Sequence, residues 1–188
     1  MNIGIAITGS FCTYSNILEQ IKLLVDKGHN VVPIVSKEVF GTDTRFGKAR
    51  DFLDKIEKTT GNNIIHTIVD AEPLGPNNKI DVLAVAPCTG NTLAKLANGL
   101  SDDAVTMSAK SHMRNYKPLV IAISTNDGLG LNMQNLAKLL NAKNVYFVPF
   151  RQDAPQKKPK SLIADLELLL PTIEKAQKNE QIQPIILG

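Results

Sequence analysis

Short apolar segments rich in β-branched residues alternate along the chain with segments in which apolar residues recur every three or four positions. The first kind indicates strands buried on both faces, and the second kind indicates amphipathic helices. Strands are predicted at residues 2–7, 29–35, 63–69, 80–86, 118–124 and 144–150, and helices around residues 17–25, 46–56, 93–97 and 133–140. The alternation predicts an α/β fold, a doubly wound Rossmann-like three-layer sandwich with a six-stranded parallel sheet in the order 3-2-1-4-5-6.

The length of 188 residues fits one domain with a core that needs no disulfide or metal. We therefore expect residues 1–188 to form a single domain. Its end differs in composition from the rest, so residues 151–188 are expected to be a C-terminal extension. Within it, a polar loop at 151–160 precedes an amphipathic helix from Leu162 to Ile173, which Pro171 is expected to kink because proline lacks a backbone donor.

Several classes of protein are disfavoured by charge and hydropathy. The net charge of +3 is small and its positive charges are mixed with negative ones, so nucleic acid is not an expected partner. No apolar stretch approaches the roughly 20 residues that span a bilayer, and no targeting segment is evident before the first strand. Cys12 and Cys88 show no metal-ligand spacing and are expected as buried thiols near a ligand, with a redox pair as the alternative. A cytoplasmic protein is expected.

Ligands of such sheets bind beyond the carboxyl ends of the strands, where the strand order reverses. The loop after the first strand, "TGSFCTY", has too few glycines for a dinucleotide fingerprint and Phe11 in place of a Walker lysine. What remains is a turn in which Gly9 permits close approach of a ligand and Ser10 can hold an anion at a helix start. The alternative is a plain helix cap by Ser10.

The loop after the second strand begins with Ser36 and Lys37. An enzyme that binds NAD would favour an acidic residue here, for the ribose hydroxyls. Serine suits a second phosphate contact better. The alternative is a simple turn with a solvated lysine.

The loop after the fourth predicted strand offers hydroxyls, an amide and backbone N–H groups but no strong acid or base. Its residues Thr89, Gly90, Asn91 and Thr92 suit the edge of a neutral planar heterocycle, or else a capped helix start. Asp102 and Asp103 follow; adjacent aspartates without further ligands indicate a cap and a solvated side chain, so no metal site is expected.

Taken together, these loops resemble the FMN-binding fold of the homo-oligomeric flavin-containing cysteine decarboxylases. The resemblance is closest to one branch of that family, the B subunits of dipicolinate synthase from spore-forming bacteria. The motifs that carry it occur in order over essentially the whole chain: "TGSFCTY" (8–14), "TDTRFG" (42–47), "DAEPLGP" (70–76), "ISTND" (123–127), "GLN" (130–132) and "KNVYFVPFRQDAPQKKP" (143–159). The resemblance implies that residues 1–188 form one flavoprotein-like domain.

The resemblance also implies roles for particular residues. Gly9, Ser10 and Phe11 match the first FMN-phosphate loop, and Ser36 and Lys37 match the second. Thr89, Gly90, Asn91 and Thr92 match the loop that holds the flavin ring and its ribityl chain, and Ser124 matches a backbone contact to the ring. Asn126 matches the asparagine that holds the substrate carboxylate in the decarboxylases.

The chain departs from the decarboxylases at two points. They carry a histidine shortly before the fourth strand, where this chain has "AEPLGPNNK" with Glu72, and they carry a cysteine in a late loop where this chain has none. Decarboxylation of a peptidyl cysteine is therefore not expected. Glu72 is a candidate base, and Arg45 in "TDTRFG" is a candidate to hold a carboxylate near the mouth of the crevice, unless it pairs with Asp43 or Asp51.

By resemblance, the chain would act with an A subunit of dipicolinate synthase that carries NADP. Together they would form pyridine-2,6-dicarboxylate from a tetrahydro- or dihydrodipicolinate precursor in the mother cell of a spore former, with FMN bound to this chain. The alternative is a non-catalytic partner that binds FMN or phosphate and stabilises the A subunit. Relatives form trimers and dodecamers, so a homo-oligomer is expected by analogy.

Overall fold

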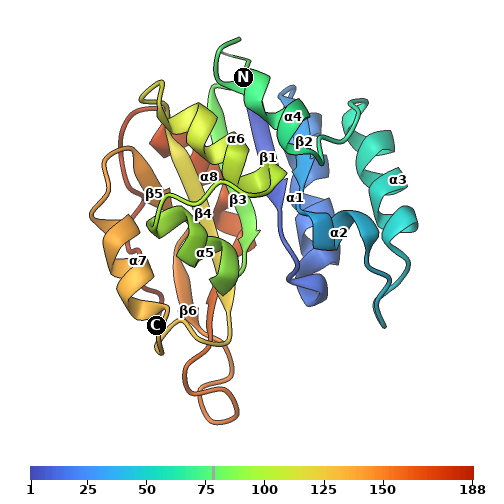
Figure 1. Cartoon of the computed structure of the whole chain (residues 1–188). Helices are drawn as coiled ribbons and strands as arrows, with labels where there is room; N and C mark the ends of the chain where they lie inside the picture. The colour runs from blue at the N-terminus through green and yellow to red at the C-terminus, as the bar shows by residue number, and fades with distance from the viewer. Residues whose placement is uncertain (78) are drawn as a thin grey trace.

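The computed structural model describes residues 1–77 and 79–188. Five strands form a parallel sheet at its centre: β1 (Asn2–Ile7), β2 (Asn30–Val35), β3 (Val82–Cys88), β4 (Leu119–Thr125) and β5 (Val145–Phe147). They lie in the spatial order β2-β1-β3-β4-β5 (Figure 1). This arrangement confirms the predicted α/β fold and the order of five of the six predicted strands.

The third predicted strand, residues 63–69, is not a strand. Only Ile65 pairs with the sheet, through one isolated parallel bridge to Ile34 on the outer side of β2. The chain then turns into the short helix α4 (Ile68–Ala71), because the Thr67 side chain accepts a hydrogen bond from the Asp70 N–H at 3.1 Å and caps it. Val69 is 79% exposed and Ile68 is also exposed, whereas Ile64 and Ile65 are partly buried against the core.

The C-terminal segment adds two antiparallel strands to the sheet, which therefore has seven strands and not six. These are β6 (Phe150–Gln152) and β7 (Leu162–Ala164), the arms of a hairpin, and β7 pairs with the end of β4 at Ser124 and Thr125. The predicted helix at 162–173 thus begins late, with a 3-10 turn (Leu166–Leu168) and α8 (Leu169–Ala176). Pro171 stands in the first turn of α8, where backbone N–H groups have no partner within the helix, so its missing donor removes no hydrogen bond of this helix.

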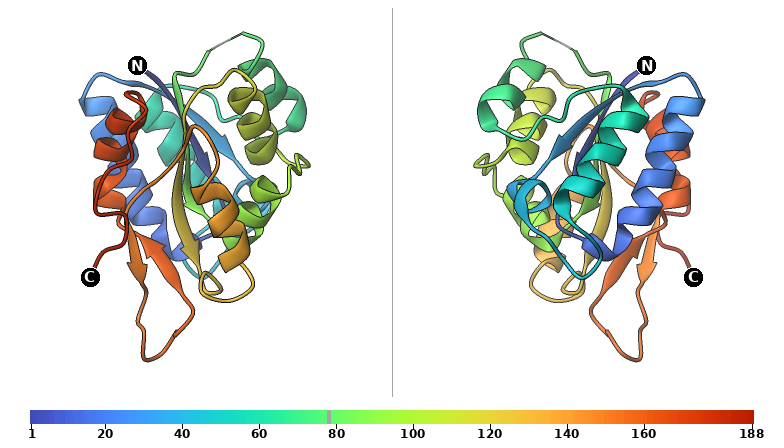
Figure 2. Two further views of the ribbon diagram at one scale, coloured as in Figure 1. Left: turned by 90° about the vertical axis from the view of Figure 1, so that its left-hand side faces the viewer. Right: turned by 90° about the vertical axis from the view of Figure 1, so that its right-hand side faces the viewer.

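Helices cover both faces of the sheet (Figure 2). One face carries α1 (Tyr14–Asp26), α3 (Ala49–Thr60) and α8; the other carries α4, α5 (Gly90–Ala97), α6 (Ala104–Met113) and α7 (Met133–Leu140). A short helix, α2 (Lys37–Gly41), follows β2, and further 3-10 turns lie at Phe11–Thr13 and Glu72–Leu74. These layers confirm the three-layer architecture.

The core lies between the sheet and its helices, and every residue of β3 is buried. The helices α1 and α3 end as the sequence indicates: Gly28 follows α1, and Gly61 closes α3 with a left-handed φ of 68°. Within residues 1–77 and 79–188, no helix has the length and apolar character to cross a membrane.

Candidate functional site

The loops after β1 and β3 are joined by one buried side chain. The Thr8 hydroxyl donates to the Pro87 carbonyl at 2.7 Å and accepts from the Thr89 N–H at 3.0 Å. A second link joins the β1 loop to β4, since the Ser10 and Ser124 hydroxyls lie 2.8 Å apart. The carboxyl ends of three neighbouring strands are therefore held together by short polar contacts.

The start of α5 is packed closely against the loop after β4. Thr89 caps the helix by accepting from the Thr92 N–H at 3.4 Å, as the helix-cap alternative predicted. Gly90 is buried, and a Cβ there would lie 2.5 Å from Thr125 Oγ1 and 2.7 Å from Asn132 Nδ2. A larger residue at this point would force one of these side chains, or the start of α5, to shift. The Thr92 N–H is taken by the Thr89 cap, while the N–H groups of Gly90 and Asn91 in the first turn have no partner within the helix and can bind a ligand.

A cavity of about 700 Å³ opens at these strand ends, within the range of roughly 300–1,000 Å³ typical of small-molecule sites. The structure brings most of the predicted site residues together in its wall. These are Gly9, Ser10, Phe11, Arg45, Thr89, Gly90, Asn91, Ser124 and Asn126.

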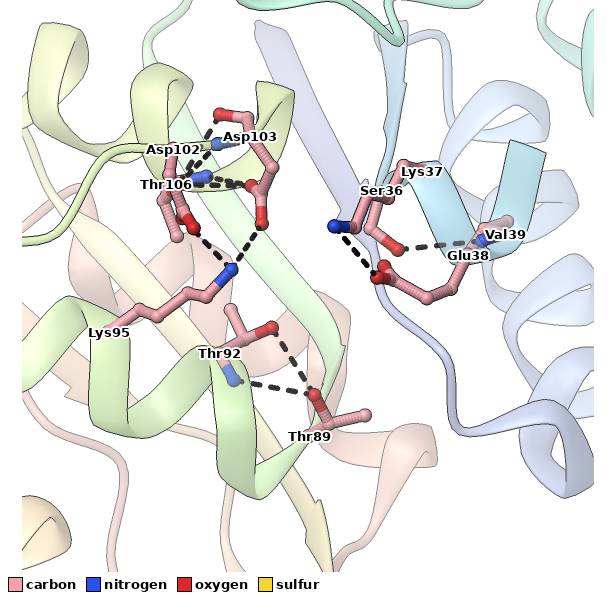
Figure 3. Close-up of polar contacts among 10 residues, drawn as sticks. All are labelled: Ser36, Lys37, Glu38, Val39, Thr89, Thr92, Lys95, Asp102, Asp103 and Thr106. Carbon is pink, nitrogen blue, oxygen red and sulfur yellow. Dashed lines mark hydrogen bonds and ion pairs between the residues drawn. The ribbon is translucent and has the colours of Figure 1, made fainter. Parts of the chain in front are cut away.

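Three predicted cofactor residues do not line the cavity (Figure 3). Ser36 is buried and caps α2 by accepting from the Val39 N–H at 3.5 Å, while the Lys37 ammonium is exposed and lies 3.9 Å from Glu38 Oε1. Thr92 is also buried, and its hydroxyl accepts from that of Thr89 at 3.2 Å. Ser36 and Thr92 are therefore buried capping and packing residues, whereas Lys37 is a solvated lysine beside Glu38.

Glu72 lies away from the cavity. It is exposed at the start of a 3-10 turn that packs against α6, and the Gly75 carbonyl in the same segment accepts from the Asn115 side chain at 2.8 Å. Asn115 comes shortly before β4, so this segment lies at the amino ends of the strands, the edge opposite the cavity (Figure 1). Within one chain, the structure does not bring the predicted base to the site.

Arg45 stands at the cavity on the tight loop between α2 and α3. Asp43 caps the start of α3 by accepting from the Ala49 N–H at 2.9 Å, and the Arg45 guanidinium lies 4.9 Å from the centroid of the Phe46 ring. Among the described residues Arg45 forms no ion pair with Asp43 or Asp51. Its charge is therefore available to a ligand.

The sequence interpretation missed the contribution of the β6–β7 hairpin, which brings Asp153, Lys158 and Ser161 to the cavity. All three lie in or next to the segment 151–160, for which the sequence predicted only a polar loop. Cys12 also lines the cavity and is exposed, whereas Cys88 is buried; both are free thiols. The hairpin strands have only three residues each, which is too short for an alternation of apolar and polar residues to predict them.

Asp102 and Asp103 both contact Lys95 of α5 (Figure 3). Lys95 Nζ lies 2.9 Å from Asp102 Oδ1 and 3.3 Å from Asp103 Oδ2, and Asp103 also caps α6 through a capping box. The hydrogen bond to Lys95 lowers the pKa of the Asp102 carboxyl and raises the pKa of Lys95. The aspartates thus act as a cap and an ion-pair partner, and no group of metal ligands occurs among the described residues.

The donors of the cavity suit a flavin mononucleotide. The wall offers the hydroxyls of Ser10 and Ser124 and the N–H groups at the starts of the 3-10 turn after β1 and of α5, which can bind phosphate oxygens and ring heteroatoms. Apolar groups from Phe11, Leu162 and Ile163 border the same space and suit a planar ring. The residues present therefore fit the cofactor.

The fold and the site are those expected of a flavin-binding α/β protein. The comparison with known sequences agrees: the chain belongs to the flavoprotein family, whose model matches residues 1–180. Within that family, the chain is similar to the B subunit of dipicolinate synthase from Bacillus subtilis, with 49% identity over 185 residues, 98% of this chain and 92% of the relative.

Solved structures show the same relationship. A crystal structure of the B subunit of dipicolinate synthase from Bacillus halodurans superposes with a TM-score of 0.92 at 45% identity, covering 100% of this chain and 96% of that chain. The FMN-dependent cysteine decarboxylase SpaF shares the fold, with a TM-score of 0.68 at 19% identity over 95% and 97% of the two chains. Membership of the flavoprotein family supports a flavin cofactor.

Proposed function

We propose that this chain is the B subunit of a dipicolinate synthase, with FMN bound in the cavity at the ends of β1, β3 and β4. It would work with an A subunit that carries NADP, in the cytoplasm of the mother cell of a spore former. The observation that carries the proposal is the cavity itself, where neutral flavin-binding loops and the carboxylate-binding candidates Arg45 and Asn126 meet in one wall. The similarity to the B subunit of the Bacillus subtilis dipicolinate synthase supports the same assignment.

The reaction forms an aromatic ring. A dihydrodipicolinate loses one hydride equivalent and one proton, and a hydroxylated precursor also loses water. Bound FMN supplies a hydride acceptor. The loops of Gly9, Ser10, Thr89, Gly90, Asn91 and Ser124 would hold FMN, with Phe11 against it, while Thr92 supports the Thr89 loop through its hydroxyl. Ser36 and Lys37 have no part in the proposal, because Ser36 caps α2 and Lys37 is exposed beside Glu38.

The side chains of Arg45 and Asn126 would orient the substrate. A guanidinium binds a carboxylate through two parallel hydrogen bonds, and the Asn126 amide can donate to a second oxygen. Orientation of this kind lowers the barrier by presenting the reacting ring carbon in one pose. Glu72 has no part in the proposal because it lies at the other edge of the sheet.

Reconstitution with the A subunit tests the proposal. Dipicolinate formation is followed by its absorbance with and without this chain, and with and without added FMN. The proposal predicts that full rate requires the chain together with FMN. A full rate from the A subunit alone would contradict it.

A second candidate is a non-catalytic partner that binds FMN or phosphate and stabilises the A subunit. The placement of Glu72 outside the cavity favours it, since no replacement for that base is evident from the motifs. The same reconstitution separates the two: a non-catalytic partner raises the melting temperature of the A subunit, and its effect on rate survives replacement of both Arg45 and Asn126.

A further inference from the structure

The turn of the β6–β7 hairpin places a lysine in the same cavity as Arg45. Lys158 Nζ lies 2.7 Å from Asp153 Oδ2. The Ser161 hydroxyl lies 3.4 Å from that same carboxylate oxygen, 3.2 Å from the Thr125 carbonyl and 3.3 Å from Asn126 Oδ1. These contacts connect the hairpin to the loop of Asn126, and the residues that make them line the same cavity.

The Lys158 ammonium retains capacity to bind a ligand. It has three N–H donors, of which Asp153 takes one, and its side chain is 51% exposed. The hydrogen bond to Asp153 raises the pKa of Lys158, which keeps the ammonium charged at neutral pH. The other carboxylate of the wall, Asp127, is occupied by its own loop, where it accepts from the Leu131 N–H at 3.2 Å and from the Asn132 amide at 3.4 Å.

Position distinguishes Lys158 from its neighbours in the hairpin. Lys157 and Lys160 carry the same charge and are exposed, but neither lines the cavity. Of these three lysines, Lys158 is the one that lines the cavity, where it contacts Asp153. The cavity therefore has two cations from distant segments, Arg45 before α3 and Lys158 in the hairpin, and Arg45 has no carboxylate partner among the described residues.

We propose that Lys158 binds the second carboxylate of a dicarboxylate ligand whose first carboxylate is held by Arg45, so that the cavity selects dicarboxylates over monocarboxylates. This inference rests on the proposed function and assigns its substrate specificity to the hairpin. Asp153 is a positioning residue, which holds the ammonium toward the ligand without contacting it.

Equilibrium dialysis with two probes, pyridine-2,6-dicarboxylate and pyridine-2-carboxylate, tests the proposal on the full chain with FMN added. The wild-type chain should bind the dicarboxylate about tenfold or more tightly than the monocarboxylate, which corresponds to one charge-assisted contact. Lys158→Met should remove most of this preference by weakening the dicarboxylate about tenfold, while the affinity for the monocarboxylate changes less than about twofold. Lys157→Met removes the same charge from the same hairpin and should leave both affinities unchanged.

The outcomes separate this inference from the proposed function. If the wild-type chain prefers the dicarboxylate and Lys158→Met keeps that preference, the role of Lys158 is refuted and the proposed function stands. Equal weakening by Lys157→Met would also refute it, because the effect would then be one of net charge. If the wild-type chain binds neither probe, both the inference and the proposed function fail.

Discussion

At the scale of single residues, the site depends on small side chains and short polar contacts. Thr8 joins two loops through two hydrogen bonds, and Gly90 leaves room for Thr125 and Asn132. The sequence reveals these residues as members of loops, but their partners lie far away in the chain. Their roles therefore become visible only when the strands are brought side by side.

Replacement of Gly90 by alanine tests this close packing. The new methyl group would lie 2.5 Å from Thr125 Oγ1, so the start of α5 or the β4 loop must shift. We expect a loss of about 1–3 kcal/mol in the free energy of unfolding, and FMN binding weakened at least tenfold. Urea denaturation and FMN fluorescence titration measure the two effects.

Gly41→Ala is the matched control, because nothing lies within 4 Å of a Cβ at Gly41. It should change neither quantity beyond experimental error. Equal behaviour of the two variants would show that Gly90 is not in close contact with the β4 loop.

At the scale of elements, the parallel strands follow from their apolar runs, whereas the short elements do not. Ile68 and Val69 suggest a strand, but the Thr67 cap directs them into α4 and leaves them exposed. The hairpin strands β6 and β7 form because they pair with each other and with the end of β4, a tertiary cause that local patterns do not contain.

The position of Glu72 in the sequence already indicated that it lies away from the cavity. Its segment directly precedes β3, and residues before a parallel strand lie at its amino end, away from the ligand edge. Arg45 and Asn126, by contrast, follow β2 and β4, and both reach the cavity. The topology alone therefore separates residues that can reach this site in one chain from those that cannot.

Helix α6 carries a buried histidine that should make stability depend on pH. His112 is 3% exposed, its Nε2 lies 2.9 Å from the Pro118 carbonyl, and burial lowers its pKa to about 4. The unfolded chain has the ordinary histidine pKa of about 6.5 and binds the proton first. The free energy of unfolding therefore has its full value above about pH 6.5. It falls by about 3 kcal/mol in all as the pH decreases toward about 4.

Urea unfolding at pH 7 and pH 5 checks this expectation. The fall in stability between these pH values should be smaller in His112→Gln than in the wild type. His29→Gln, which replaces a half-exposed ring, should retain the fall. A wild-type fall that is equally large in His112→Gln would assign the pH dependence to other groups.

At the scale of the whole molecule, the doubly wound sheet places three loops at one edge and leaves the opposite edge to structural turns (Figure 1). The fold class and the main loops of the cavity could be predicted from the sequence, because buried parallel strands are nearly continuous apolar runs. The contribution of the β6–β7 hairpin to the cavity could not be predicted, since it depends on which strand β7 pairs with.

The surface of the chain carries large apolar side chains that a partner could cover, including Leu131 and Val69 at 81% and 79% exposure. In keeping with the homo-oligomer expected by analogy, light scattering coupled to gel filtration should give a mass that is a multiple of 20.5 kDa, with a trimer or dodecamer expected. A single mass of 20.5 kDa at all concentrations would contradict this expectation.

The central claim is that the cavity at the ends of β1, β3 and β4 binds one flavin. The most direct measurement is the amount of FMN that stays with the purified chain after saturation and gel filtration, read from the visible absorbance of flavin. We expect a yellow protein with about one FMN per chain, with less FMN retained by Gly90→Ala and the full amount retained by Gly41→Ala. A wild-type protein that stays colourless after saturation with FMN would contradict the account.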